Sequence, residues 1–255
     1  MRAGPLHLSL FIAILLALGG GCATQDKALG ELSSAARLYA EGRKALDEGY
    51  YEIAIEKFEQ LETRYPFGEY AQQAQLDMAY AYYKSDNPAS AVAAADRFIK
   101  TYPRHPHVDY AYYLRGLANF AVGGDFFDRL LKEDPAKRDP RPAREAFRYF
   151  AELVTRFPDS PYAADARARM LYLRNFLARH ELHVARFYMR RGAYVAALNR
   201  GRTVLETYYQ TPAVPEALAL MSEAYDALGL AQLAAETRRV LELNYPGRLA
   251  RKGKD

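Results

Sequence analysis

The chain has 255 residues, with one cysteine, no tryptophan and a formal net charge of only +4. Its 35 basic and 31 acidic residues are nearly balanced, so no field of one sign implies nucleic acid as a partner. A single cysteine cannot form an internal disulfide, which leaves either a small buried side chain or a thiol kept for chemistry.

The first 21 residues have the features of a secretory signal. The stretch "LSLFIAILLAL" at 8–18 is apolar apart from one serine, and Arg2 and the amino terminus precede it with positive charge. At about 1.5 Å per residue it spans roughly 16 Å, about half of a ~30 Å bilayer core, which suits a signal peptide and not a spanning helix. Gly19–Gly21 then lead directly into Cys22, and this layout resembles a bacterial lipoprotein signal. We therefore expect residues 1–21 to be removed.

The lipoprotein resemblance also implies a location. One acyl chain binds a membrane only marginally, whereas a lipidated amino-terminal cysteine in this class carries an N-acyl chain and an S-diacylglycerol group, enough for permanent anchoring. Ala23 follows Cys22 where an Asp would mark retention at the inner membrane, so the resemblance implies the outer membrane, with the protein facing the periplasm. We expect residues 22–32 to be a flexible linker and the covalent lipid to be the only non-protein group, with no cofactor.

Four aromatic–proline pairs recur along the rest of the chain. Proline disfavours helix at the residue before it, so each pair is expected to end a helix. The spacing from Pro66 to Pro103 is close to the ~34-residue period of a tetratricopeptide repeat, and an alanine stands twelve residues before each proline, as in the A-x3-F…P part of that repeat. The four pairs are Tyr65-Pro66, Tyr102-Pro103, Phe157-Pro158 and Tyr245-Pro246.

Strand signals are nearly absent, and the predicted fold is all-α: a tetratricopeptide-repeat superhelical solenoid of about five helix pairs plus one extra helix. A stretch rich in Gly, Pro and charge at about 121–142 predicts an inserted loop within repeat three. Repeat four is the weakest, because Gly201 stands at the Phe place and no proline ends the unit. We expect repeats one to three over 33–158, a connecting helix over 159–179, repeats four and five over 180–246, and a basic tail over 247–255.

Motifs for catalysis are missing from the chain. "HELH" at His180–His183 is one residue short of the H-E-x-x-H spacing that places two metal ligands one helical turn apart. The sequence contains no nucleophile elbow, no Walker A motif and no dinucleotide-binding glycine pattern. We therefore expect a protein that is not an enzyme and holds no metal, and that binds other molecules in the concave groove of its solenoid.

Aromatic residues are more numerous than the repeat core requires. The stretch "YPFGEY" lies at the first turn between repeats, and "AYAYYK" and "DYAYYLRG" lie in the first helices of repeats two and three. Consecutive helical residues point about 100° apart, so one ring of each group can fill the core while another faces the groove. Ordinary packing accounts for most of these rings, and the rest predict a groove for an extended, aromatic-bearing peptide. The candidates are Tyr65, Phe67, Tyr70, Tyr82 and Tyr113.

Four stretches behind the lipoprotein signal resemble the BamD family of tetratricopeptide lipoproteins: "RYPFGEYAQQAQLDMAYAYYK", "DYAYYLRGLANF", "KRDPRPAREAF" and "RRGAYVAALNR". The resemblance implies a non-catalytic component of the outer-membrane β-barrel assembly machinery. It would bind the POTRA domains of the barrel-forming subunit, beside other assembly lipoproteins. The first three repeats would recognise carboxy-terminal, aromatic-ended signals of unfolded outer-membrane proteins.

The resemblance assigns roles to individual residues. Arg200 closes the "GAYVAALNR" stretch and, with Tyr194, is expected in the contact region for the barrel subunit. The "YPFG" stretch, Tyr65 to Gly68, corresponds to the signal-reading region, which adds Gly68 to the groove candidates.

Two other functions compete with barrel assembly, of which the first remains an alternative and the second fails on length. A periplasmic repeat adaptor for cell-wall synthesis would bind wall synthases and show no affinity for barrel signals. A wall-cleaving enzyme that uses repeats as a handle would need a catalytic Glu in a second domain, and only nine residues follow Pro246. The family-specific stretches, rather than a physical argument, favour barrel assembly over the adaptor.

Overall fold

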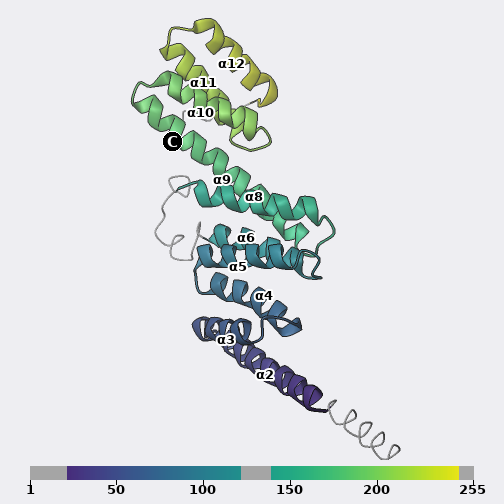
Figure 1. Ribbon diagram of the computed structural model, residues 1–255. Helices are drawn as coiled ribbons and strands as arrows, with labels where there is room; N and C mark the ends of the chain where they lie inside the picture. Colours follow the sequence, from purple (N-terminus) through teal and green to yellow (C-terminus); the bar gives the residue numbers. More distant parts are fainter. Residues whose placement is uncertain (1–21, 122–138, 247–255) are drawn as a thin grey trace, which may run out of the picture. The chain divides into compact units, whose positions relative to one another are not determined.

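The computed structural model describes residues 22–121 and 139–246. Within these two stretches the chain forms ten α-helices and no strand (Figure 1). Successive helices pack as pairs, which confirms the predicted all-α solenoid. The helices are α2 (Cys22–Asp47), α3 (Tyr51–Arg64), α4 (Glu69–Lys84), α5 (Pro88–Thr101), α6 (Val108–Ala121), α8 (Arg141–Arg156), α9 (Ala163–Arg190), α10 (Tyr194–Thr207), α11 (Val214–Ala227) and α12 (Ala231–Asn244).

The second helix of every pair repeats the same buried pattern. One alanine in each is fully buried, which lets the neighbouring helix approach closely, and an apolar side chain seven residues later on the same face is also fully buried. The alanines are Ala54, Ala91, Ala146, Ala197 and Ala234, and their partners are Leu61, Phe98, Leu153, Val204 and Leu241.

An aromatic residue ends each of these second helices. Its backbone N–H donates to the carbonyl of the buried partner residue four positions earlier, and the chain then leaves helical geometry. Repeat four follows this rule through Tyr208 although it lacks the proline found in the other four, so the aromatic residue is the more general stop signal. The five residues are Tyr65, Tyr102, Phe157, Tyr208 and Tyr245.

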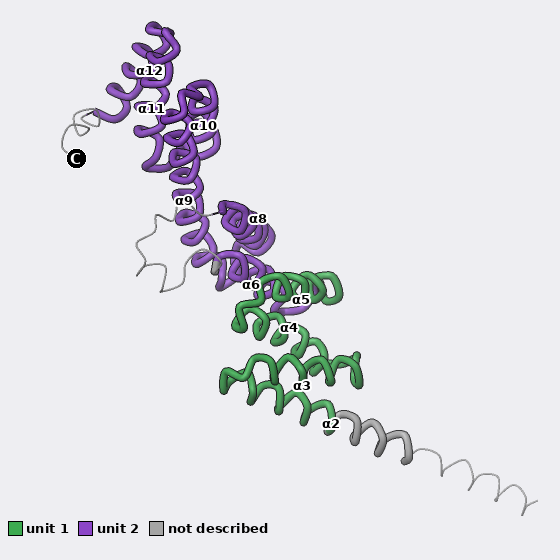
Figure 2. The backbone as a smooth tube through the Cα atoms, turned by 90° about the vertical axis from the view of Figure 1, so that its left-hand side faces the viewer, with its two compact units in different colours: residues 1–103 green, residues 104–255 purple. Residues whose placement is uncertain are grey.

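The described residues belong to two compact units, drawn in separate colours in Figure 2. The described residues up to 103 form unit 1, which contains repeats one and two, and those from 104 onward form unit 2 with the remaining helices. The core of unit 1 gathers Leu38, Phe58, Leu61 and Met78 from α2, α3 and α4. A separate core in unit 2 gathers side chains from α9, α10, α11 and α12.

The helix α9 differs from the prediction. The expected boundary between a connecting helix at 159–179 and a repeat beginning at 180 lies inside one continuous helix of 28 residues. The reason is local, since no Gly or Pro interrupts 163–190 and the buried face continues through the predicted boundary. One helix therefore follows repeat three and also serves as the first helix of repeat four.

Two further segments bear on the predicted boundaries. Residues 22–32, expected to be a linker, form the first part of α2, where proline is absent and the helix formers Ala and Leu occur twice each. The inserted loop predicted at about 121–142 lies mostly outside the described residues, and α6 and α8 bound it at Ala121 and Arg141.

Candidate functional site

The turn between α3 and α4 exposes one large apolar side chain. Tyr65 caps α3 and packs half-buried against the core of unit 1. Gly68 precedes α4 with φ of 106°, a conformation that side-chain-bearing residues rarely adopt, so glycine is required at this turn. Between them Phe67 is 90% exposed, in contrast to the half-buried ring of Tyr65.

Tyr70 extends this surface toward α2. It is 37% exposed, and its ring centre lies 5.6 Å from that of Tyr39, which in turn lies 6.1 Å from that of Phe58 in the core. Tyr70 and Tyr39 therefore connect the exposed surface to Phe58 in the interior of unit 1. Of the predicted groove residues in this unit, Phe67 and Tyr70 are the two that present their rings to solvent.

Tyr82 has a mainly structural environment. It packs half-buried against the unit 1 core, and its hydroxyl donates to Glu59 Oε1 at 3.2 Å. Burial, together with the nearby carboxylate of Glu59, raises the pKa of Tyr82.

A buried carboxylate lies beside this surface, and sequence analysis did not identify it. Asp77 on α4 accepts hydrogen bonds from the Tyr39 hydroxyl at 2.9 Å and from Gln73 at 3.2 Å, and Arg43 lies 3.4 Å away. Burial raises the pKa of Asp77, although each of these hydrogen bonds acts in the opposite direction. A signal exists in the sequence, because Asp77 stands directly between the apolar residues Leu76 and Met78.

Tyr113 belongs to unit 2, where it joins α6 to α9. Its ring stacks on that of Tyr162, with centres 4.9 Å apart and planes at 17°, and its hydroxyl donates to Asp165 at 2.5 Å. Burial and the hydrogen bond to Asp165 raise the pKa of Tyr113 to about 12. The packing between these two helices thus occupies both ends of the side chain.

The predicted contact residues for the barrel subunit lie on α10. Tyr194, the first residue of α10, packs half-buried against the cluster of Leu198, Met221 and Ala224. Arg200 remains partly exposed and donates from Nη1 to Glu181 Oε2 at 3.0 Å. That hydrogen bond raises the pKa of Arg200.

Glu181 is the residue that sequence analysis missed at this site. It is 2% exposed, and its second carboxylate oxygen accepts a hydrogen bond from Arg144 Nη2 on α8 at 3.2 Å. Glu181 is the glutamate of "HELH", a stretch whose His180 and His183 lack the spacing of two metal ligands. Glu181 lies four residues after buried Leu177, and this spacing places it on the buried face of α9.

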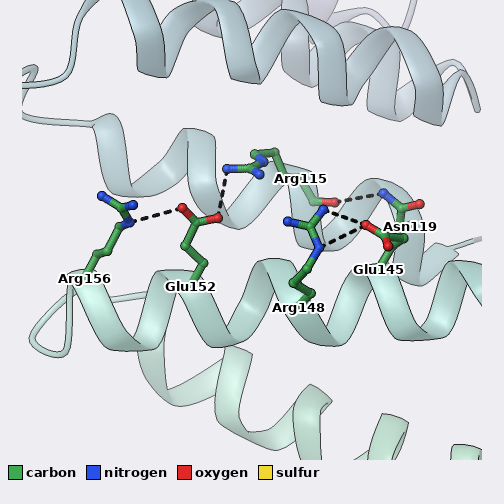
Figure 3. A network of polar contacts seen from close by, with 6 residues as sticks. All are labelled: Arg115, Asn119, Glu145, Arg148, Glu152 and Arg156. Carbon is green, nitrogen blue, oxygen red and sulfur yellow. Dashed lines mark hydrogen bonds and ion pairs between the residues drawn. The ribbon is translucent and has the colours of Figure 1, made fainter.

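A third polar network joins α6 to α8 (Figure 3). Arg115 on α6 is only 8% exposed, lies 4.2 Å above the Tyr149 ring and pairs with Glu152 at 3.3 Å. Glu152 also pairs with Arg156 at 3.1 Å, while one turn away Arg148 pairs with Glu145. The Arg115–Glu152 pair compensates a buried charge between α6 and α8, whereas Glu145 and Arg148 form an exposed pair within α8.

The remaining predictions concern Cys22, the two ends of the chain and metal binding. Cys22 is the first residue of α2, and the predicted signal at 1–21 and tail at 247–255 lie outside the described residues. Over 22–121 and 139–246, no three His, Cys, Asp or Glu side chains gather in a way that could hold a metal ion. In the same part of the chain, no helix combines the length and apolarity needed to cross a membrane.

The repeated alanine and aromatic positions define the class: this is an all-helical protein of tetratricopeptide-type repeats. A family model described as outer membrane lipoprotein, YfiO, matches residues 32–241. The outer membrane protein assembly factor BamD of Neisseria meningitidis serogroup A is 46% identical over 96% of this chain and 92% of its own. The BamD proteins of Vibrio cholerae and Xylella fastidiosa strain Temecula1 are 41% and 38% identical, over 91% and 98% of this chain and 95% and 86% of theirs. The chain belongs to the family of outer membrane protein assembly factor BamD.

Proposed function

We propose that this protein is a non-catalytic lipoprotein scaffold of outer-membrane protein assembly, anchored through lipid on Cys22 and facing the periplasm. It binds the POTRA domains of a barrel-forming subunit, works beside other assembly lipoproteins, and receives the targeting signals of unfolded outer-membrane proteins. The observation that carries the proposal is the similarity to assembly factors over 96% of the chain, with 46% identity to one of them.

Signal recognition is assigned to the exposed rings of unit 1. A phenylalanine that is 90% exposed has almost no packing role in its own unit, and Tyr70 beside it is partly exposed as well. Two such rings offer an apolar contact to the aromatic residue that ends a barrel signal. Gly68 and Tyr65 shape this turn, and Tyr82 packs α4 against the core of unit 1.

A matched pair of phenylalanines tests signal recognition. A peptide with an aromatic carboxy-terminal residue, labelled with a fluorophore, is titrated with wild type, Phe67→Ala and Phe187→Ala. Phe187 in unit 2 is also exposed, at 43%, so it controls for loss of any surface ring. We expect Phe67→Ala to weaken binding about tenfold, and Phe187→Ala to leave it unchanged. Equal affinities for all three proteins would contradict the assignment to unit 1.

Binding to the barrel subunit is assigned to the α10 region around Arg200. The guanidinium is partly exposed and can pair with a carboxylate in two parallel hydrogen bonds. Pull-down from detergent-solubilised envelopes with the lipidated protein tests the partner directly. A POTRA-bearing barrel protein is the expected capture, whereas wall synthases without a barrel protein would support the adaptor function instead.

The contact between Arg200 and Glu181 determines which Arg200 variant can test binding without disturbing the fold. Arg200→Glu would place a second carboxylate beside the buried Glu181 and disturb folding as well as binding. Arg200→Lys keeps the charge but removes the planar fork, so it tests recognition with less risk to the fold. We expect the barrel protein to be recovered in lower yield with Arg200→Lys.

A further inference from the structure

We propose that Glu181 holds Arg144 and Arg200 as a two-guanidinium clamp for one carboxylate group on the folded partner domain. The inference rests on the proposed function, since it concerns the same surface. It adds a second contact residue, Arg144, and a positioning residue, Glu181, that does not itself touch the partner.

The geometry joins three helices at one carboxylate. Oε1 of Glu181 on α9 accepts from Arg144 Nη2 on α8 at 3.2 Å, and Oε2 accepts from Arg200 Nη1 on α10 at 3.0 Å. The two arginines are 56 positions apart in the sequence. Their guanidinium groups nevertheless bind the two oxygens of the same carboxylate, that of Glu181. Each uses one terminal nitrogen for Glu181 and keeps other N–H donors of its planar fork.

Burial shows which members can reach a partner. The Glu181 side chain is 3% exposed, while those of Arg144 and Arg200 are 49% and 40% exposed. The guanidinium groups therefore cover the carboxylate on its solvent side. A partner would meet the two cations and not the anion beneath them.

The charges of the cluster point to the ligand. Two cations and one anion leave a net charge of +1, and among the described residues no other carboxylate lies within ion-pair distance of either arginine. Tyr188 interacts with Arg200 and Tyr208 with Arg144, and both are neutral hydroxyl groups. A single Asp or Glu side chain of the partner matches this excess charge and the fork geometry of arginine.

Glu181 contributes by ordering the arginines before the partner arrives. A free arginine side chain loses rotamer entropy when a partner immobilises it, which weakens binding. Hydrogen bonds to a buried, fixed carboxylate restrict both side chains in advance. The same anion lowers the positive charge of the surface, so positioning and simple attraction predict opposite effects when Glu181 is neutralised.

Neutralising Glu181 therefore distinguishes positioning of the arginines from simple electrostatic attraction, and the change in binding affinity is the quantity to measure. The affinity of the full chain in detergent for the purified POTRA region of the barrel subunit is measured by isothermal titration calorimetry. The variants are Glu181→Gln, Glu181→Asp, Arg144→Lys and Arg200→Lys, with Asp226→Asn and Arg238→Lys as controls from an exposed ion pair between α11 and α12. Unfolding midpoints of all variants are measured alongside, so that affinity is compared only among folded proteins.

The expected pattern is specific to the clamp. Glu181→Gln raises the net charge yet weakens binding about tenfold, and Arg144→Lys and Arg200→Lys each weaken it by a similar factor. Glu181→Asp recovers part of the affinity, and the controls bind as wild type does. Equal or tighter binding by folded Glu181→Gln, or an unaffected Arg144→Lys, would overturn the clamp while leaving the proposed function in place. Should the wild type itself fail to bind the POTRA region, the proposed function fails first and the clamp loses its partner.

Discussion

Two regions achieve a close approach of helices at a glycine, but they do so against different side chains. In repeat three, a Cβ added at Gly116 on α6 would lie 2.3 Å from a ring carbon of Phe150 on α8, and Gly42 meets Phe58 in repeat one in the same way. In repeat four, the glycine is Gly201 on α10, and its neighbour is Met221 from the next helix, with Cγ 2.5 Å from the added atom.

Comparing the two regions separates the effect of the distance to the neighbouring side chain from the effect of that side chain's flexibility. A phenylalanine ring in a closely packed core has no alternative position, whereas an unbranched methionine can change rotamer. The distances at Gly116 and Gly201 are similar, so they alone predict similar intolerance to a side chain. Side-chain flexibility predicts a large difference, and variants of Phe150, Gly116 and Gly201 distinguish these expectations or test the packing behind them.

Removing the ring from repeat three should have the largest effect. Phe150 is fully buried and also contacts the rings of Tyr113 and Phe120. We expect Phe150→Ala to lower the free energy of unfolding by about 3–5 kcal/mol, measured by urea denaturation of the purified protein. A loss below about 1 kcal/mol would mean that repeat three does not depend on this ring.

Adding a methyl group opposite the ring should have the next largest effect. We expect Gly116→Ala to destabilise by about 1–3 kcal/mol, even though alanine favours helix over glycine by about 1 kcal/mol. Combining it with Phe150→Leu tests the cause, because a smaller, branched side chain can yield space. The double variant should lose less than the sum of the two single losses. Strict additivity would place the origin of the effect elsewhere.

The same substitution in repeat four should be nearly neutral. We expect Gly201→Ala to change the free energy of unfolding by less than about 1 kcal/mol, because Met221 moves aside and the gain in helix propensity offsets the residual strain. Denaturation under the conditions used for Gly116→Ala gives the comparison directly. A loss equal to that of Gly116→Ala would show that distance, and not the neighbour's flexibility, controls tolerance.

Much of the fold could be predicted from the sequence, because its signals are local. The alanine of each second helix and the aromatic residue that ends it occupy fixed spacings, and four of the five are marked by proline. The repeat period alone predicts a boundary inside α9, whereas the absence of Gly and Pro between 163 and 190 favours one continuous helix. A period of ~34 residues predicts where a repeat recurs, and not whether two helices merge.

The candidate sites were less predictable, since they depend on contacts between distant residues. Exposure of Phe67 and burial of Tyr65 could not be separated by a motif that contains both. Arg144, Glu181 and Arg200 come from three helices, and only the packed unit brings them together. Helical spacing could place Glu181 on a buried face, but it could not identify the two cations that stabilise its charge there.

Asp77 in unit 1 offers a second contrast with Glu181 in unit 2, since its oxygens accept hydrogen bonds from neutral Tyr39 and Gln73 and only one arginine lies near. Burial raises the pKa of Asp77 above its unfolded value of about 3.9, so over the range between the two values the folded state binds more protons than the unfolded state. The stability that Asp77 contributes should therefore be greatest below its unfolded pKa and fall as pH rises through its folded pKa.

We expect wild type to gain stability relative to Asp77→Asn as pH is lowered from 7 to 4, in urea titrations at several pH values. Tyr39→Phe removes a hydrogen bond that favours the ionised form, so it should raise the pKa of Asp77 further and steepen this dependence. A relative stability that instead rises with pH would mean that Arg43 outweighs burial and that the folded protein favours the ionised form of Asp77.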